Sequence, residues 1–482
     1  MGYGALSDMA QHRDELWKDE LWKLELTEVA ELIRTRQLTS EQVTESTLRR
    51  IEKFDSQLKS YAWVMSDSAL AAARTADAEI AREHYRGVLH GVPIGVKDLC
   101  YTMDAPTAAG TTILHEFRPQ YDATVVARLR AAGAVITGKL AMTEGAYLGY
   151  HPSLPVPVNP WDAATWAGVS SSGCGVATAA GLCFGSIASD TGGSIRFPTS
   201  VCGLTGIKPT WGRVSRHGII ELAASFDHVG PIARSARDAA ALLTVMAGSD
   251  VNDPTSSVEP VPNYAANLAL TQMPRVGVDW PKVAAFDQDT NAMMVDVIET
   301  LDSMGWPVVE IELPALDPIV QAFGKLRSVE TAIAHADTYP AYADQYGPTL
   351  RQLIDTGRKL GAVEHQALVK QRLAFTESLR RVFHDVDIVV LPSSGLASPT
   401  LETMRGLGHD PQLIARLAAP TAPFNASGNP TICLPAGATP RGTPLGVQFI
   451  GRKFAEQFLV QAGHAFQQVT TFHRRRPPLR GC

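Results

Sequence analysis

Several features that mark whole classes of protein are missing from this sequence of 482 residues. It contains no run of about 18 apolar residues, so we expect no membrane-spanning helix. Its first residues lack the apolar core of a signal peptide. The six cysteines are scattered, with neither a C-x-x-C pair nor the spacing of a zinc site. We therefore expect a cytoplasmic protein whose thiols are reduced.

A strong positive charge is also missing. Charged residues make up 19% of the chain, and the net charge is -6. This balance argues against a surface for nucleic acid or for anionic membranes. The one basic run, "HRRRPPLR" at 473–480, is short and is interpreted as a solvated tail. A small molecule is the expected partner, and the sequence leaves a homodimer open.

Three familiar catalytic motifs do not occur. There is no H-E-x-x-H pair, and neither Ser170 nor Ser194 stands in the G-x-S-x-G pattern of a nucleophile elbow. The stretch "GAVITGKL", 133–140, almost fits a phosphate-binding loop. It fails because Leu140 replaces the hydroxyl that would bind magnesium, and because its apolar middle is a strand, whereas such a loop follows a strand.

The hydrophobic pattern predicts an α/β fold. Thr39 and Gln42 form a capping box ahead of a helix with a single apolar face. Further on, Asp122 is expected to cap a helix that stops at Gly133 and leads into a strand at 134–137. Strands on both sides of a helix-rich stretch at about 315–385 suggest that this stretch is a cap on one sheet domain.

The predicted organisation is therefore N-terminal helices over 1–60 and a single domain over 61–475. The tandem "DELWKDELWK", 14–23, predicts an amphipathic helix whose tryptophans dock on that domain. Whether Met1 or Met9 is the natural start stays open.

The most unusual stretch runs from Ala167 to Pro198 and consists almost entirely of small residues, ending in "SDTGGSIRFP". It places Ser194 behind two glycines, and the nearest histidines in the sequence are His151, His217 and His228. A hydrolytic serine needs a base within hydrogen-bond reach. The base must therefore come from elsewhere in the chain, and it need not be a histidine.

Four motifs together resemble the amidase signature family: "GVPIGVKD", the small-residue stretch 167–198, "GIKPT" just after it, and the closing "PFNASGNPTICLPAG...PLGVQFIGR". The resemblance implies a large α/β/α sandwich whose central mixed sheet is covered by helices. It also implies a Ser–cis-Ser–Lys triad, with Lys97 as base, Ser194 as nucleophile, and Ser170, which lies 24 residues earlier, as the intermediate serine. No metal or organic cofactor is implied.

The sequence departs from the family pattern beside the intermediate serine. Trp166 stands near the usual proline, Val169 replaces a glycine and Cys174 replaces a serine. The triad residues are unaffected, but the backbone path and the pocket shape there become harder to predict. Ser171 and Ser172 are interpreted as turn serines.

The triad makes chemical sense only if Lys97 is neutral. An ordinary lysine is protonated at neutral pH, but desolvation lowers its pKa. Lys97 stands at the end of a buried strand, so a neutral amine there could take a proton from Ser170, which takes one from Ser194. The alternative is a surface ion pair between Lys97 and Asp98, which is less consistent with the apolar flanks.

The glycines before Ser194 suggest an oxyanion hole. Its donors would be the main-chain N–H groups of Thr191, Gly192, Gly193 and Ser194. Asp190 is expected to brace this loop. Arg196 could be a structural ion-pair partner, which we favour, or could attract a substrate carboxylate.

The substrate pocket is expected beside Gly145, Ala146 and Tyr147, within the stretch 145–150. The proline-rich loop that follows and the helix-rich cap would complete it.

The sequence therefore predicts a serine hydrolase that cleaves the C–N bond of small amides, with carbamates (urethanes) as a further substrate class, through an acyl-enzyme. One alternative is the glutaminase component of a glutamyl-tRNA amidotransferase, which would need partner subunits. The other is a binding protein with a decayed site.

Overall fold

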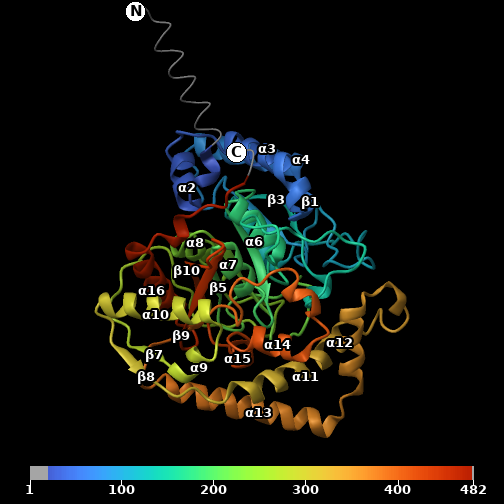
Figure 1. Cartoon of the computed structure of the whole chain (residues 1–482). Coiled ribbons are helices and arrows are strands. Elements are labelled where there is room, and N and C mark those ends of the chain that lie inside the picture. Colours follow the sequence, from blue (N-terminus) through green and yellow to red (C-terminus); the bar gives the residue numbers. More distant parts are fainter. Residues whose placement is uncertain (1–19, 480–482) are drawn as a thin grey trace, which may run out of the picture.

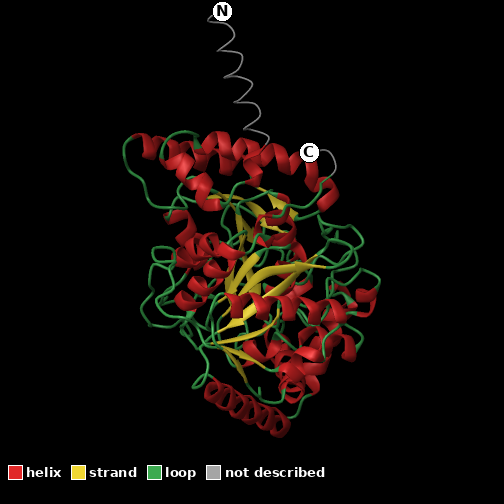
Figure 2. Ribbon diagram, turned by 60° about the vertical axis from the view of Figure 1, so that its left-hand side comes forward, coloured by secondary structure: helices red, strands yellow, loops and turns green. Residues whose placement is uncertain are grey.

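A single mixed sheet of eleven strands forms the centre of the computed structural model, which describes residues 20–479. The strand order is β1-β3-β2-β4-β6-β5-β10-β11-β9-β7-β8. Strand β2 runs parallel to β3 and β4, and β7 runs parallel to β8 and β9, while the central strands pair antiparallel. Figure 2 shows the sheet enclosed by helices. The predicted α/β fold with a mixed sheet is confirmed.

Most strands are buried along their whole length, as expected for a sheet covered on both faces. Their bounds are β1 Tyr61–Val64, β2 Pro93–Lys97, β3 Val135–Leu140, β4 Gly185–Asp190, β5 Thr205–Lys208, β6 His228–Ala233, β7 Val276–Val278, β8 Val308–Glu310, β9 Ile388–Pro392, β10 Thr431–Ala438 and β11 Pro444–Ile450.

Fifteen α-helices surround the sheet within residues 20–479. They are α2 Leu26–Arg34, α3 Ser40–Leu58, α4 Ser66–Ala81, α5 Thr124–Ala131, α6 Ser172–Ala180, α7 Arg196–Cys202, α8 Ala236–Met246, α9 Trp280–Ala284, α10 Gln288–Ser303, α11 Leu316–Ala334, α12 Pro348–Lys359, α13 Ala362–Val382, α14 Pro411–Ala418, α15 Ala422–Ala426 and α16 Glu456–Val469.

Helices α7 and α16 lie on opposite faces of the sheet. A Cβ built on Gly206 of β5 would lie 2.5 Å from Thr199 in α7, whereas one built on Gly463 of α16 would lie 2.8 Å from Ile432 of β10. Gly206 pairs with the residue after Ile432, so the two contacts come from opposite faces. Part of the small-residue stretch lies on the α7 face of the sheet. Bulkier side chains there would prevent α7 from packing so close to β5.

The two predicted helix starts have different outcomes. The capping box of Thr39 and Gln42 is present at the start of α3. The prediction for Asp122 was wrong, because α5 begins after Ala123 without a side-chain cap. Asp122 instead accepts a hydrogen bond of 2.8 Å from Met103 N and pairs with Arg130 at 3.0 Å. Two local partners thus take the carboxylate that would have capped the helix.

Of the predicted N-terminal tryptophan helix, Trp17 and the rest of residues 14–19 lie outside the described residues. The described part, Leu21–Lys23, is a short 3-10 helix in which Trp22 is buried. The guanidinium of Arg50 from α3 lies 4.0 Å from its ring centre. A Cβ built on Gly181, just after α6, would lie 2.7 Å from Trp22 Cβ, so Trp22 also packs on the predicted domain.

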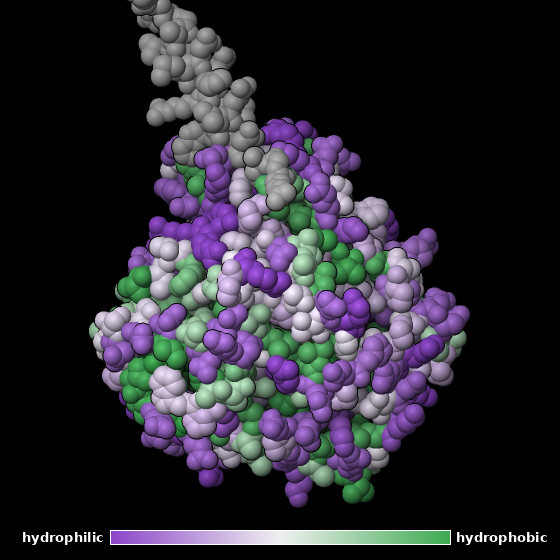
Figure 3. All heavy atoms as spheres, viewed as in Figure 1, coloured by the Kyte–Doolittle hydropathy of each residue, from purple (hydrophilic) through white to green (hydrophobic). Residues whose placement is uncertain are grey.

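The helix-rich stretch near 315–385 contains α11, α12 and α13, which lie together along one end of the molecule (Figure 1). The face in Figure 3 mixes hydrophilic residues with smaller hydrophobic areas. Within residues 20–479, no helix is both long enough and apolar enough to cross a membrane.

Candidate active site

Lys97 ends β2 and is completely buried. Its Nζ lies 2.7 Å from Ser170 Oγ and 2.8 Å from Ser189 Oγ. Desolvation by burial lowers the pKa of Lys97 to about 8, against weaker opposing effects that include Cys174. Asp98 does not pair with Lys97. It faces Lys139 instead, at 3.3 Å from Nζ to Oδ1.

Ser170 is the one of three adjacent serines whose hydroxyl meets Lys97. The peptide bond between Val169 and Ser170 is cis. Ser171 donates through its Oγ to the carbonyl of Ser189 at 3.1 Å, and Ser172 accepts from the hydroxyl of Tyr150 at 2.8 Å. Their hydroxyls hold neighbouring segments together, and α6 begins at Ser172.

Ser194 lies in the loop between β4 and α7, and 8% of its surface stays exposed, whereas Lys97 has none. Gly193, just before it, has φ +139°, and a Cβ there would lie 2.3 Å from the Phe197 ring. Only glycine fits this tight turn. Ser194 therefore keeps a small exposed surface beside this tight turn.

Asp190 and Arg196 form a fully buried ion pair beneath this loop, with 2.9 Å between Nη2 and Oδ1. The Asp190 carboxylate also accepts from Gly193 N at 2.8 Å and from Ile195 N at 3.0 Å. Burial alone would raise the pKa of Asp190, but the charge and hydrogen bonds of Arg196 outweigh it and lower the pKa. These contacts fix the backbone around Ser194.

Two peptide groups of the loop have determined orientations. The carbonyl of Gly193 accepts from Phe197 N at 2.7 Å, so the N–H of Ser194, in the same trans peptide, points the other way. The N–H of Gly193 is used by Asp190. Of the four predicted oxyanion donors, Thr191, Gly192 and Ser194 thus have N–H groups without an acceptor in the described part of the chain.

Sequence reasoning missed two polar neighbours of the site. Ser189 reaches Lys97 only because β2 and β4 are adjacent in the sheet, an order that no local pattern reveals. His228, in β6, lies opposite Asp190, and its Nδ1 is 2.6 Å from the carbonyl of Phe226. Burial lowers the pKa of His228, so this ring supports the backbone in its neutral form.

The predicted pocket residues 145–147 lie beside α11, the first helix of the cap. Gly145 and Ala146 both have positive φ, +55° and +61°. The hydroxyl of Tyr147 accepts from Arg327 Nη2 of α11 at 3.4 Å. Helix α11 also touches the loop of Ser194, because a Cβ on Gly192 would lie 2.9 Å from the Phe323 ring. The segment 145–147 and the loop of Ser194 are therefore joined through α11.

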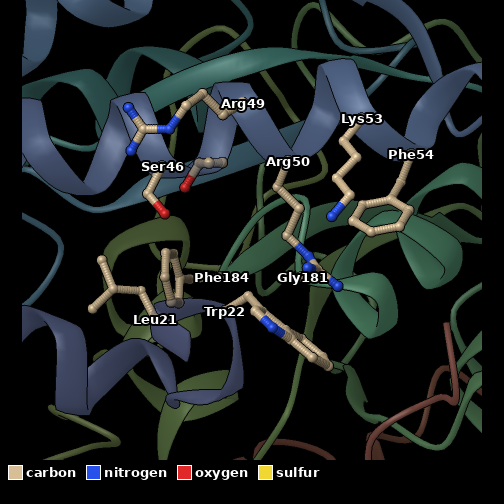
Figure 4. Close-up of a pocket in the computed structure, with 10 residues that line it drawn as sticks. Leu21, Trp22, Ser46, Arg49, Arg50, Lys53, Phe54, Gly181 and Phe184 are labelled. Atoms are coloured by element: carbon tan, nitrogen blue, oxygen red, sulfur yellow. The ribbon is translucent and has the colours of Figure 1, made fainter. Parts of the chain in front are cut away.

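The cavity in Figure 4 lies elsewhere. It measures about 290 Å³ and is bounded by Trp22, Arg50, Phe54 and Phe184, among others, and by none of the triad candidates. In residues 20–479, no three His, Cys, Asp or Glu side chains are grouped so that they could hold a metal ion.

Comparison with known proteins supplies the family. The family described as Amidase matches residues 42–460. The chain belongs to the amidase signature family. It is 77% identical over 454 residues to the protein named "Putative amidase AmiD" of Mycobacterium tuberculosis (strain ATCC 25618 / H37Rv), covering 94% of this chain and 96% of that relative. It is 35% identical to a glutamyl-tRNA(Gln) amidotransferase subunit of Chloroflexus aggregans (strain MD-66 / DSM 9485), covering 92% and 96%.

Solved structures agree with this assignment. The 6-aminohexanoate cyclic dimer hydrolase in complex with its substrate superposes with a TM-score of 0.86 at 26% identity, covering 95% of this chain and 99% of that one. The peptide amidase of Stenotrophomonas maltophilia gives a TM-score of 0.81 at 27% identity, covering 95% and 98%. The amidase is therefore an enzyme, a hydrolase of C–N bonds that acts on amides. The alternative of a binding protein with a decayed site is wrong.

Proposed function

We propose that this amidase hydrolyses small amides through an acyl-enzyme on Ser194, with Ser170 as proton relay and Lys97 as base. The observation that carries the proposal is the 2.7 Å contact between the buried Lys97 Nζ and Ser170 Oγ. With its pKa lowered to about 8, Lys97 is partly neutral near physiological pH and can accept a proton. A lysine surrounded by hydroxyls thus takes the place of the missing histidine.

The reaction then proceeds in two steps. Ser194 Oγ attacks the amide carbonyl while its proton passes to Ser170, whose own proton passes to Lys97. The C–N bond breaks as the leaving amine takes a proton back along the same path, which leaves an ester on Ser194. Water hydrolyses this ester with the same base, releasing the carboxylic acid and restoring the serine.

The N–H of Ser194 is the best-placed oxyanion donor, because its peptide carbonyl is anchored to α7. Thr191 and Gly192 offer two further donors. The peptide that joins Gly192 to Gly193 is held at both ends, since Thr421 Oγ1 donates to Gly192 O at 2.7 Å. Asp190 and Arg196 support the loop from below. Such fixed donors need no rearrangement when charge develops on the substrate oxygen.

A fluorophosphonate probe tests the nucleophile. The wild-type protein should gain the mass of one phosphonyl group on Ser194 and lose its amidase activity in step. Ser194→Ala should fold with an unchanged melting temperature, remain unlabelled and be inactive. Full activity in folded Ser194→Ala would reject the assignment.

Carbamates form the second substrate class in this proposal, because the same attack opens their carbonyl. Butyranilide and ethyl N-phenylcarbamate both release aniline, so a single assay compares them. Turnover of both supports the wider substrate range, whereas turnover of the anilide alone would limit the enzyme to amides.

A glutaminase that works inside a glutamyl-tRNA amidotransferase is the second candidate, since the Chloroflexus relative of that kind is 35% identical over most of the chain. The 77% identity to a protein named as an amidase favours the free-standing enzyme. Hydrolysis of simple amides by the purified chain alone would support the amidase. Activity that appears only with partner subunits would favour the glutaminase.

A further inference from the structure

Arg327 of α11 is a buried arginine beside the nucleophile loop, and 8% of its surface is exposed. Its Nη1 lies 3.9 Å from the position of a Cβ on Gly192, two residues before Ser194. Its guanidinium stacks on the rings of Tyr147 and Phe323, at 4.7 Å and 4.9 Å from their centres. Arg327 therefore lies between the predicted pocket segment and the loop that holds Ser194.

The guanidinium of Arg327 has almost no hydrogen-bond acceptors. Of its five N–H donors, one makes a long contact of 3.4 Å to the Tyr147 hydroxyl, and Nε is buried without a partner. Within residues 20–479, no carboxylate forms an ion pair with Arg327 or acts on its pKa. Burial lowers the pKa of Arg327, and Tyr147 is the one group that opposes this. An arginine is seldom buried without an anionic partner.

The carboxylates nearest to Arg327, on the same helix and beside the Ser194 loop, already accept hydrogen bonds from other residues. Glu330, one turn further along α11, accepts from the N–H and the hydroxyl of Ser225 at 2.8 and 2.6 Å. Asp227 accepts from Thr191 Oγ1 at 2.5 Å and from Leu222 N at 2.9 Å. Both carboxylates are held by these partners, so residues 20–479 supply no counter-ion to Arg327.

Arg196, which also lies against the Ser194 loop, differs from Arg327 in having acceptors for its guanidinium group. It is completely buried, and its Nε and Nη2 donate to Asp190 at 3.0 and 2.9 Å, while its Nη1 donates to the carbonyl of Thr421 at 2.9 Å. Every guanidinium nitrogen of Arg196 has an acceptor within the protein. A substrate anion would therefore find no unused donor at Arg196, whereas nearly all the N–H donors of Arg327 are unused.

Resting on the proposed function, we propose that Arg327 binds a carboxylate of the substrate, so that this amidase prefers small amides that carry an acid group. A carboxylate accepts two parallel N–H bonds from a guanidinium. One negative charge matches the single cation of the site, whereas a phosphate would bring nearly two.

The position of Arg327 also limits the length of the substrate. Gly192 and Ser194 are two residues apart, so their Cα atoms are separated by at most about 7 Å. The carboxylate and the scissile carbonyl must therefore lie close together. The chemistry fits the half-amide of a short dicarboxylic acid.

Matched amides test this preference. Succinamate and 4-oxopentanamide have nearly the same shape, but only succinamate carries a carboxylate, and malonamate and glutaramate vary the length by one methylene. We expect the wild-type enzyme to show a higher kcat/KM for at least one of the acids than for the neutral amide. Equal or lower values for all three acids would overturn the proposal.

Arg327→Met removes the charge while retaining an apolar chain against Tyr147 and Phe323. It should lower the selectivity, which is the ratio of kcat/KM for the acid to that for 4-oxopentanamide, by about 10- to 100-fold. Arg327→Lys should recover part of the ratio. The matched control is Arg358→Met, which removes a positive charge from an exposed position of the cap and should leave the ratio unchanged. An equal loss for both amides in Arg327→Met would show a purely structural arginine and overturn the proposal.

A binding measurement separates this proposal from the proposed hydrolysis. Calorimetry on Ser194→Ala should show succinamate binding that weakens when Arg327→Lys is added, by a smaller factor than the loss of selectivity in Arg327→Met; this arm holds even if Arg327→Met fails to fold. Binding that does not depend on Arg327 would reject the carboxylate site while leaving the hydrolase intact. Arg327-dependent binding without hydrolysis of any amide by the wild type would support the site and reject the reaction.

Discussion

Lys97 and Lys139 are two buried lysines on neighbouring parallel strands with opposite surroundings. Lys139 Nζ lies 3.3 Å from the Asp98 carboxylate and donates to the carbonyl of Cys100 at 2.8 Å and to Thr107 Oγ1 at 2.6 Å. Among the described residues, the hydrogen-bond partners of Lys97 Nζ are the hydroxyls of Ser170 and Ser189. A carboxylate favours the ammonium form, whereas burial among hydroxyls favours the amine. Burial lowers the pKa of both lysines, but only at Lys139 does a carboxylate in direct contact oppose it, which is why we propose Lys97 and not Lys139 as the base.

The largest expected effect is on activity in Lys97→Met. Without the base, kcat should fall by about 10²- to 10⁴-fold. Burial lowers the pKa of Lys97 from 10.5 to about 8, so the charged lysine costs about 3 kcal/mol of stability at neutral pH. The variant should therefore melt at a higher temperature than the wild type while being nearly inactive.

Kinetics and calorimetry on the same Lys97→Met preparation check both halves of this prediction. Lys97→Arg is the matched control, because it keeps a positive charge that cannot be released. Strong rescue by arginine would mean that position 97 supplies charge alone and not a base.

The reverse result is expected for Lys139→Met. Loss of the Lys139 ammonium group leaves the Asp98 carboxylate buried without a cation. This should lower the free energy of unfolding by about 3–5 kcal/mol. Chemical denaturation measures this change. The folded fraction should keep a kcat within a few-fold of wild type. Adding Asp98→Asn should recover much of the stability, and a double variant as unstable as the single one would contradict the ion-pair interpretation.

Of the two lysines, Lys97 could be singled out from the sequence, whereas the pairing of Lys139 could not. The apolar strand before Lys97 and the resemblance around Ser170 led to two residues whose side chains lie in contact, and Ser194 follows the glycine turn that the sequence predicts. The hydrophobic pattern predicted the α/β class, and the family resemblance implied the mixed sheet. Lys139 lay in a failed phosphate-loop motif, and its pairing with Asp98 depends on the packing of β3 against β2.

Contacts between distant segments could not be predicted. Ser189 meets Lys97 because of strand order, and Arg327 reaches the Ser194 loop because α11, more than 120 residues later in the chain, packs on it. Neither residue has a local signal, since a serine in a strand and an arginine in a helix are ordinary. The caps and turns fixed by neighbouring residues were largely predictable, although Asp122 shows that two nearby partners can override a capping preference.

The pH dependence of the wild type sharpens the comparison further. Because Lys97 must be neutral to act, kcat/KM should fall about tenfold per pH unit below a pKa of about 8. Between about pH 8 and 10.5, the unfolded chain holds a proton that the folded protein has released, so stability should rise with pH across this window. A rate profile on a stable neutral amide measures the first effect. An acid limb centred near the ordinary histidine pKa of about 6.5 would point to a different base.

The smallest expected effect belongs to Ser189→Ala, which removes one of the two hydroxyls at Lys97 Nζ, 2.8 Å away. The ammonium loses an acceptor, so the pKa of Lys97 should fall further and the acid limb should move to lower pH by about one unit. The amine is also held less firmly, so kcat on the high-pH plateau should fall by a few-fold. Ser189→Thr keeps the hydroxyl on a residue suited to a strand and should restore both values. Ser171→Ala is the control, because its hydroxyl binds the Ser189 carbonyl and not Lys97. A limb that stays in place in Ser189→Ala would show that Ser170 alone sets the proton affinity of Lys97, and an upward shift would show that Ser189 stabilises the neutral amine.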